Sequence, residues 1–203
     1  GDYREGPSYW PGRLGAEFVW DASAKRCGEG NGEGAYRISK ILHGDSWSRA
    51  GGSPLLSPGV GIEEGDLLLG IDGAPVDAAK SVDEHLLNKA GREVELEVCS
   101  PGDETSRRVV VKTVTSHQQL YYRDWVRTRR ELVEELSDGK IGYVHVPDMG
   151  PEGYAEFHRG YASQHSKEGL IVDVRYNGGG HISQLILEKL RRKPLGFDLM
   201  RHG

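Results

Sequence analysis

The residues best suited to chemistry stand four in a row, Asn177-Gly178-Gly179-Gly180, shortly after the apolar run Leu170 to Val174. Glycines in such a place let backbone amides approach a ligand closely, and the start of a following helix favours negative charge. An oxyanion hole needs this geometry, and so does a phosphate cradle. The phosphate interpretation is weaker because the chain has no GxxxxGK[ST] motif. A plain strand-to-helix turn remains an open alternative.

A second candidate site is the segment Gly12-Arg13-Leu14-Gly15-Ala16. An apolar-glycine-apolar turn can point successive N–H groups into one concavity that binds a carboxylate, and the adjacent strand edge can accept a peptide as an extra strand. A helix expected over residues 80–90 would form the other wall of that groove. An ordinary glycine turn before a strand explains the same residues.

A serine nucleophile with its base is not evident in the chain. There is no G-x-S-x-G motif, and Ser137-Asp138-Gly139-Lys140, which fits S-x-x-K, is better explained as a helix-to-strand turn. His145 alternates with apolar residues on an expected strand, which indicates a packing or hydrogen-bonding role. His181 opens a helix beside the glycines, and we expect a neutral or structural role there too, because a general base needs a nucleophile within about 3 Å.

The two cysteines, Cys27 and Cys99, are about 70 residues apart. Nothing else in the sequence suggests an oxidising compartment, so we expect two reduced thiols rather than a disulfide. No CxxC motif or Cys/His cluster is present, so neither a metal site nor a cofactor is predicted.

Composition narrows the class of protein. Of the 203 residues 29 are glycine, about twice the usual share, yet they follow no three-residue period, which excludes collagen. No apolar run approaches the ~18 residues of a membrane span, and the first residues do not read as a signal peptide. The net charge of −5 argues against a nucleic-acid surface.

The first part of the chain has the period of short strands. Residues 1–11 are rich in turn formers and read as a linker. Residues 12–115 are predicted to form about five strands and one helix, the proportions of a small β-barrel with a flanking helix. The expected strands are 14–20, 36–42, 65–73, 93–98 and 107–114, and the expected helix is 80–90.

The second part, residues 116–203, changes period. A helix over 121–136, with Trp125, Leu132, Val133 and Leu136 as its apolar stripe, precedes a strand-helix-strand-helix series. The series comprises a strand 141–146, a helix 151–166, a strand 170–174 and a helix 181–193. Such alternation predicts an α/β layer with parallel pairing. Because two strands and their helices seldom close a core, we expect a partial, truncated domain.

The order of elements in the first part resembles a PDZ domain. The run EEGDLLLGIDGAPV, residues 63–76, is similar to the stretch in which a glycine-aspartate turn enters a strand that ends in an Asn/Asp-Gly turn. The resemblance makes Leu14, Gly15 and Ala16 the carboxylate-binding loop. Ala16 departs from the pattern, since a bulkier apolar residue is usual there.

The second part resembles the tricorn and carboxy-terminal processing peptidases, serine peptidases that carry a PDZ domain beside an α/β core. The strings KIGYVHVPDMG and GLIVDVRYNGGGHISQLILEKL carry the resemblance. It implies that Gly180 donates an oxyanion-hole amide, with Gly179 as a second candidate. It also maps an acidic residue that prefers basic substrate side chains onto Asp198. The serine nucleophile and the histidine base of that family fall outside this chain.

Two functions follow. The first is the PDZ and partial core region of a cytoplasmic serine peptidase that hydrolyses peptides, inactive as a fragment and without a cofactor or metal. Its expected partners are peptide substrates and further copies of the parent protein in a ring-type assembly, with neither nucleic acid nor membrane. The alternative is a non-catalytic PDZ-type module that binds peptides or acts as a scaffold.

Overall fold

The computed structural model describes residues 9–27, 34–44 and 52–192. The chain forms two compact units, Gly1–Trp125 and Val126–Gly203, and the division falls inside one helix, α2 (Gln118–Leu136). The predicted domain boundary at 115/116 stays a prediction.

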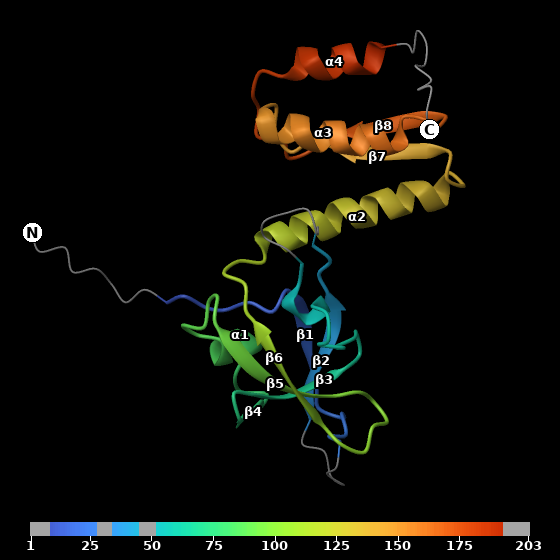
Figure 1. Ribbon diagram of the computed structural model, residues 1–203. Coiled ribbons are helices and arrows are strands. Elements are labelled where there is room, and N and C mark those ends of the chain that lie inside the picture. Colours follow the sequence, from blue (N-terminus) through green and yellow to red (C-terminus); the bar gives the residue numbers. More distant parts are fainter. Residues whose placement is uncertain (1–8, 28–33, 45–51, 193–203) are drawn as a thin grey trace, which may run out of the picture. The chain divides into compact units, whose positions relative to one another are not determined.

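The first unit is built on a six-stranded antiparallel sheet in the order β1-β2-β3-β5-β6, with β4 paired to β3 (Figure 1). The fold class expected from the sequence, a PDZ-like strand domain followed by an α/β layer, is confirmed. The strands are β1 (Ala16–Asp21), β2 (Ala35–Ile41), β3 (Leu67–Ile71), β4 (Ala74–Pro75), β5 (Glu93–Cys99) and β6 (Arg107–Lys112).

Alternating apolar residues explain this sheet. In β5 the side chains of Val94, Leu96 and Val98 are at most 1% exposed while the glutamates between them are not buried. The turn between β3 and β4 is Asp72-Gly73, and both residues adopt positive φ, as a tight hairpin requires.

The expected helix over residues 80–90 is wrong in length. The helix α1 spans only Val82–His85, although Ser81 and Glu84 form the reciprocal bonds of a capping box. After it the chain continues in three-residue turns, with Lys89 N donating to Leu86 O, and Asn88 adopts a φ of 59°. A residue in the left-handed region ends an α-helix. Leu86 and Ala90 therefore lie in the turns after α1 and do not continue a helix that contains Val82.

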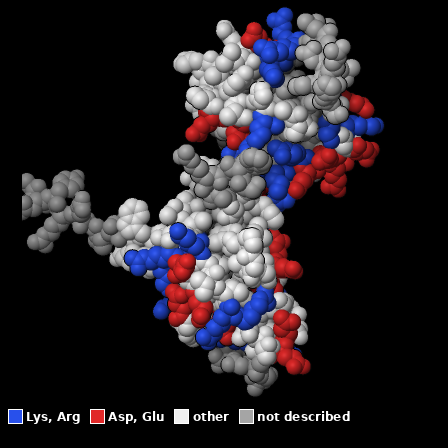
Figure 2. All heavy atoms as spheres, in the orientation of Figure 1, with Lys and Arg blue, Asp and Glu red and all other residues white. Residues whose placement is uncertain are grey.

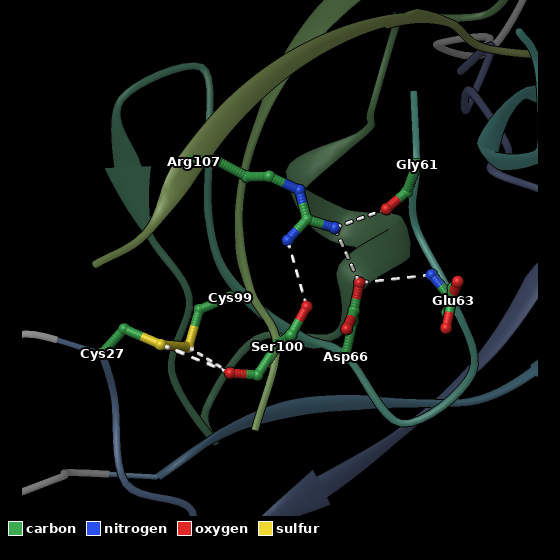
Figure 3. Close-up of polar contacts among 7 residues, drawn as sticks. All are labelled: Cys27, Gly61, Glu63, Asp66, Cys99, Ser100 and Arg107. Carbon is green, nitrogen blue, oxygen red and sulfur yellow. Dashed lines mark hydrogen bonds and ion pairs between the residues drawn. A yellow bond between two sulfur atoms is a disulfide. The ribbon is translucent and has the colours of Figure 1, made fainter. Parts of the chain in front are cut away.

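The expectation of two reduced thiols is also wrong: Cys27 and Cys99 form a disulfide, with their Cα atoms 6.1 Å apart (Figure 3). The bond joins the loop after β1 to the end of β5. Cys99 is 1% exposed in a small apolar cluster with Leu67 and Leu69. The pairing of β3 with β5 sets Cys99 opposite Leu67, and the loop after β1 brings Cys27 to it, which separation along the chain does not reveal.

Beside the disulfide, Arg107 fixes the loop that leads into β3 (Figure 3). Its Nη2 donates to Gly61 O at 2.6 Å and to the buried carboxylate of Asp66 at 2.9 Å, and its Nη1 donates to Ser100 Oγ. Asp66 also accepts from Glu63 N at 3.2 Å. The carboxylate therefore has one partner in the loop before β3 and one on β6.

The helix α2 does not bury the stripe that the sequence predicts. Leu132 is 42% and Leu136 78% exposed, whereas Leu120 and Asp124 are each 2% exposed. Asp124 is buried because it pairs with Lys40 Nζ at 2.5 Å and accepts from His43 N. These partners are some 80 residues away in sequence, so helical periodicity alone could not select this face.

The second unit has a two-stranded parallel sheet, β7 (Ile141–His145) and β8 (Gly169–Asp173), with helices α3 (Pro151–Gln164) and α4 (Ser183–Arg191). The helix α3 packs on β7 (Figure 1). There the side chain of Val144 lies directly against Gly160. The core of this unit is formed by Val144, Val146, Phe157 and Ile186.

Figure 2 shows acidic and basic side chains intermixed on the visible face of the described residues, with no broad area of one sign. Over the same described residues, no helix combines the length and the apolar character needed to cross a membrane.

Candidate functional site

The candidate site lies where the two parallel strands of the second unit end. His145, the last residue of β7, is paired with Asp173, the last residue of β8. From there two loops run side by side, residues 146–150 and residues 174–182. In α/β layers the carboxyl ends of parallel strands are where ligands bind, because loops from neighbouring strands converge there.

The two loops are held together by backbone hydrogen bonds. Gly178 N donates to Pro147 O at 2.9 Å, and Met149 N donates to Gly179 O at 2.7 Å. Met149 O in turn accepts from both His181 N and Ile182 N. The glycine loop therefore has a fixed position on the loop that follows β7.

Gly180 occupies a position that no other residue fits. Its φ is 137°, and a Cβ atom there would lie 2.1 Å from Met149 O, which is backbone and cannot swing away. Gly180 is itself exposed. Within the described ranges its amide donates no hydrogen bond to the protein.

Peptide geometry gives the direction of that amide. The Gly180 N–H and the Gly179 carbonyl belong to one planar trans peptide and point in opposite directions. Because the Gly179 carbonyl accepts from Met149 N, the Gly180 N–H points away from the 146–150 loop. An unbonded amide that points away from the loop holding it is available as a donor, which is what an oxyanion hole needs.

Gly179 is placed differently. Its φ is 83°, and a Cβ atom there would meet nothing within 4 Å. Its N–H donates to Asn177 Oδ1 at 2.7 Å, while Asn177 Nδ2 donates to Val146 O at 2.9 Å. The Gly179 amide thus already has an acceptor, which leaves Gly180 as the stronger of the two predicted donors.

The helix α4 begins directly after this loop. Its N-cap residue, Ile182, makes no side-chain capping bond. The positive end of the helix dipole thus follows the glycines without a capping carboxylate, and such an end favours an anion nearby.

A charged cluster fixes the start of the glycine loop. Tyr143 Oη donates to Asp173 Oδ2 at 2.6 Å, and Arg175 Nη2 donates to the same oxygen at 2.5 Å. Asp173 is 7% exposed, and the Arg175 hydrogen bonds hold the pKa of its carboxyl well below the usual range. Burial, with Asp173 next to it, raises the pKa of Tyr143. The carboxylate is therefore charged at any physiological pH.

His145 makes the kind of hydrogen bond expected from the sequence, and the role of His181 stays a prediction. His145 is 5% exposed, and its Nε2 donates to Arg175 O at 2.8 Å, since a carbonyl can only accept. His181 is exposed, and its backbone amide is bonded to Met149 O.

Ser137, the serine of the S-x-x-K match, lies in the turn after α2, where its Oγ accepts from Ile141 N at 3.0 Å.

The second predicted site, the loop Leu14-Gly15-Ala16, is buried along its length. Gly15 has the positive φ, 64°, that a nest of amides uses. Its carbonyl accepts from Leu42 N, and Leu14 O accepts from Ser53 Oγ at 2.8 Å. The side chain of Leu120 lies directly against Gly15. Within the first unit this loop is therefore covered.

The neighbour of that loop, Arg13, forms an ion pair with Asp83 of α1. The two predicted walls of the groove are thus linked by opposite charges at this end. Arg13 and Asp83 also act on the pKa of His117, which is lowered chiefly by burial.

Asp198, the remaining predicted site residue, lies outside the described residues. Among the residues that are described, no group of three or more His, Cys, Asp or Glu side chains could hold a metal ion.

Sequence reasoning missed the part played by Asn177 and by the cluster of Tyr143, Asp173 and Arg175. A signal was present for the cluster, because an acid and a base two residues apart at the end of a buried strand can pair at its carboxyl end. Nothing in the sequence shows that Tyr143, 30 residues earlier, completes it.

The PDZ-type sheet and the parallel layer with its glycine loop define a chain in which a PDZ domain precedes an α/β peptidase core. Family models agree: residues 12–116 match the tricorn protease PDZ domain, and residues 140–200 match peptidase family S41. The chain therefore belongs to the tricorn protease family.

Individual proteins show the same likeness. The chain is 44% identical to a tricorn protease homolog of Saccharolobus solfataricus over 192 residues, 95% of this chain and 17% of that protein. It is 40% identical to the tricorn protease of Thermoplasma volcanium, over 100% of this chain and 20% of that protein. The crystal structure of the tricorn protease matches with a TM-score of 0.80 and 36% identity, over 95% of this chain and 18% of that one. The chain thus spans about a fifth of the length of these relatives.

Proposed function

We propose that this chain supplies the PDZ domain and the oxyanion-binding part of the core of a serine-type peptidase. The observation that supports the proposal most is the amide of the exposed residue Gly180, which is unbonded within the described residues and points away from the hydrogen-bonded loop 146–150. The family match over residues 140–200 gives this amide its chemical context.

In the proposed reaction a serine hydroxyl attacks the scissile carbonyl of a peptide, and the carbonyl oxygen becomes an oxyanion. The Gly180 N–H donates a hydrogen bond to that oxygen, and the start of α4 adds a favourable potential. The nucleophile and its base belong to parts of the full-length protein outside this chain. Asp198 pairs with a lysine or arginine side chain of the substrate.

Peptides are the proposed substrates, and further copies of the full-length protein, arranged in a ring, are the proposed assembly. We place the protein in the cytoplasm on the strength of the family resemblance. The disulfide Cys27–Cys99 argues against a cytoplasmic location, because structural disulfides are rare in reducing compartments. Cell fractionation combined with thiol labelling of the isolated protein decides between the cytoplasm and an oxidising compartment.

The alternative is a non-catalytic PDZ-type module that binds peptides or acts as a scaffold, and one observation bears on which of these two roles the PDZ domain has. The loop Leu14 to Ala16 is buried, and Leu120 lies on it, which favours a bracing role over capture of free carboxyl termini. Titration with a peptide and its C-terminally amidated form tests this point. Preference for the free carboxylate would establish the loop as a binding site.

The test of the peptidase proposal uses the full-length protein. We expect it to cleave fluorogenic peptides with lysine or arginine before the scissile bond and to react with a fluorophosphonate probe. Replacement Asp198→Asn should raise KM for these substrates and leave a substrate with a neutral side chain unaffected. A full-length protein that is folded, cleaves no peptide and takes up no probe would refute the proposal.

A further inference from the structure

We propose that Asn177 is a positioning residue, whose carboxamide sets the direction of the Gly180 amide toward the reacting carbonyl. This inference rests on the proposed peptidase function. It assigns to the Asn177 side chain a role that acts through another group, the Gly180 amide.

The carboxamide of Asn177 bridges the two loops of the site. Its Nδ2 donates to Val146 O at 2.9 Å, and its Oδ1 accepts from Gly179 N at 2.7 Å. The opposite orientation of the group would place oxygen against oxygen and N–H against N–H, so the hydrogen-bond network assigns the two atoms. A side chain of this length with a donor and an acceptor at one tip is required.

The consequence for Gly180 follows from two consecutive peptide planes. Asn177 holds the N–H of Gly179, and Met149 N holds the carbonyl of Gly179. With both sides of Gly179 fixed, the peptide that carries the Gly180 N–H has little freedom to rotate. Without Asn177, only the Met149 bond would restrain that peptide on this side.

The backbone around the bridge needs such a restraint. Tyr176 has a φ of 60°, which is unfavourable for a residue with a Cβ, and the φ values of Gly179 and Gly180 are also positive. Sparsely populated backbone conformations persist where surrounding bonds enforce them. Asn177 lies inside this unusual segment, and its two hydrogen bonds tie the segment to Gly179 and to Val146 of the other loop.

The experiment compares Asn177→Ala and Asn177→Asp with the wild type in the full-length protein. Because loss of an oxyanion donor costs about 10²–10³ in kcat, a misdirected donor should lower kcat about 10- to 100-fold, with KM changed less than about twofold. A peptide boronate, which imitates the tetrahedral intermediate, should lose affinity by a similar factor. Gln119→Glu, an exposed position in the first unit, controls for the added charge of the aspartate variant.

The aspartate variant has a distinctive pH dependence. A protonated carboxyl at position 177 can donate its O–H to Val146 O and still accept from Gly179 N, but an ionised carboxylate cannot donate. The ratio of kcat in Asn177→Asp to kcat in the wild type should therefore rise as the pH falls toward the carboxyl pKa. A side chain that serves packing alone would give a ratio independent of pH, and that result would overturn the proposal.

A measurement without substrate separates the possible failures. Hydrogen exchange at the Gly179 amide should be slow in the wild type and at least tenfold faster in Asn177→Ala, with the melting temperature of both proteins recorded alongside. An active wild type with variants that keep its kcat overturns the inference alone. A folded wild type without peptidase activity overturns the proposed function, and the inference with it.

Discussion

The side chain of Leu120, in the first turn of α2, lies directly against Gly15 in the loop before β1: a Cβ atom on Gly15 would be 2.7 Å from Leu120 Cδ1. The contact joins segments 105 residues apart within the first unit, and it closes the loop that the sequence marks as a carboxylate site. Leu120 is 2% exposed, so the contact is part of the core.

The first prediction concerns this pair. Gly15→Ala should lower the free energy of unfolding by about 2–4 kcal/mol, because it adds a methyl group to a filled space and a Cβ to a residue with a φ of 64°. Leu120→Ala alone should cost about 2–5 kcal/mol. In urea unfolding, the double variant should lose less free energy of unfolding than the sum of the two single losses, since the smaller side chain at position 120 makes room for the methyl group. Strict additivity would contradict the contact.

The second prediction concerns the disulfide. Cys27→Ser should lower the free energy of unfolding by up to about 4 kcal/mol, because the bond closes a loop with a sequence separation of 72 and restricts the unfolded chain. Thermal unfolding with and without a reducing agent checks this. The reductant should lower the melting temperature of the wild type to that of Cys27→Ser and leave the variant unchanged. An unreduced wild type with two titratable thiols would show that the bond does not form.

The third prediction concerns the backbone at the site. Gly180→Ala should destabilise the second unit severely, because the new Cβ would meet Met149 O at 2.1 Å. Gly179→Ala is the matched control: its Cβ meets nothing within 4 Å, so only the positive φ opposes it, at a cost of about 1–2 kcal/mol. Circular dichroism during heating compares the two variants. Equal stability would contradict the close approach at Gly180.

The fourth prediction concerns pH. The pKa of Asp173 is lowered in the folded chain, mainly by hydrogen bonds from Arg175, so the stabilisation is fully present above the unfolded pKa of about 3.9. It declines as the pH falls from there toward the folded pKa. The difference in unfolding free energy between wild type and Arg175→Met should therefore be constant at neutral pH and shrink below about pH 4. In an Asp173→Asn background, Arg175→Met should show no such pH dependence.

Local patterns predicted the strands well. The strict alternation from Glu93 to Val98 has one physical solution, a strand with one buried face, and β5 follows it. The turn Asp72-Gly73 and the strand-helix order after residue 140 were predictable for the same reason, since each depends on neighbouring residues alone.

The sequence could not reveal what long-range partners decide. The buried face of α2 is set by Gly15 and Lys40, and the disulfide depends on the strand order β1-β2-β3-β5 of the whole sheet. At the glycine loop the residue types indicated a site, but the sequence does not tell which backbone amide lacks an acceptor in the protein. That depends on Asn177, whose carboxamide occupies the Gly179 N–H.

The disulfide also changes the topology of the chain. From Cys27 to Cys99 the first unit is a covalent ring, and the two remaining stretches of chain leave it as tails. One cut of the backbone inside the ring opens it without releasing a piece, so a nicked chain keeps its full mass until the sulfur bond is reduced. For a domain proposed to reside in a peptidase, the two pieces therefore stay covalently joined after a first accidental cleavage inside the ring.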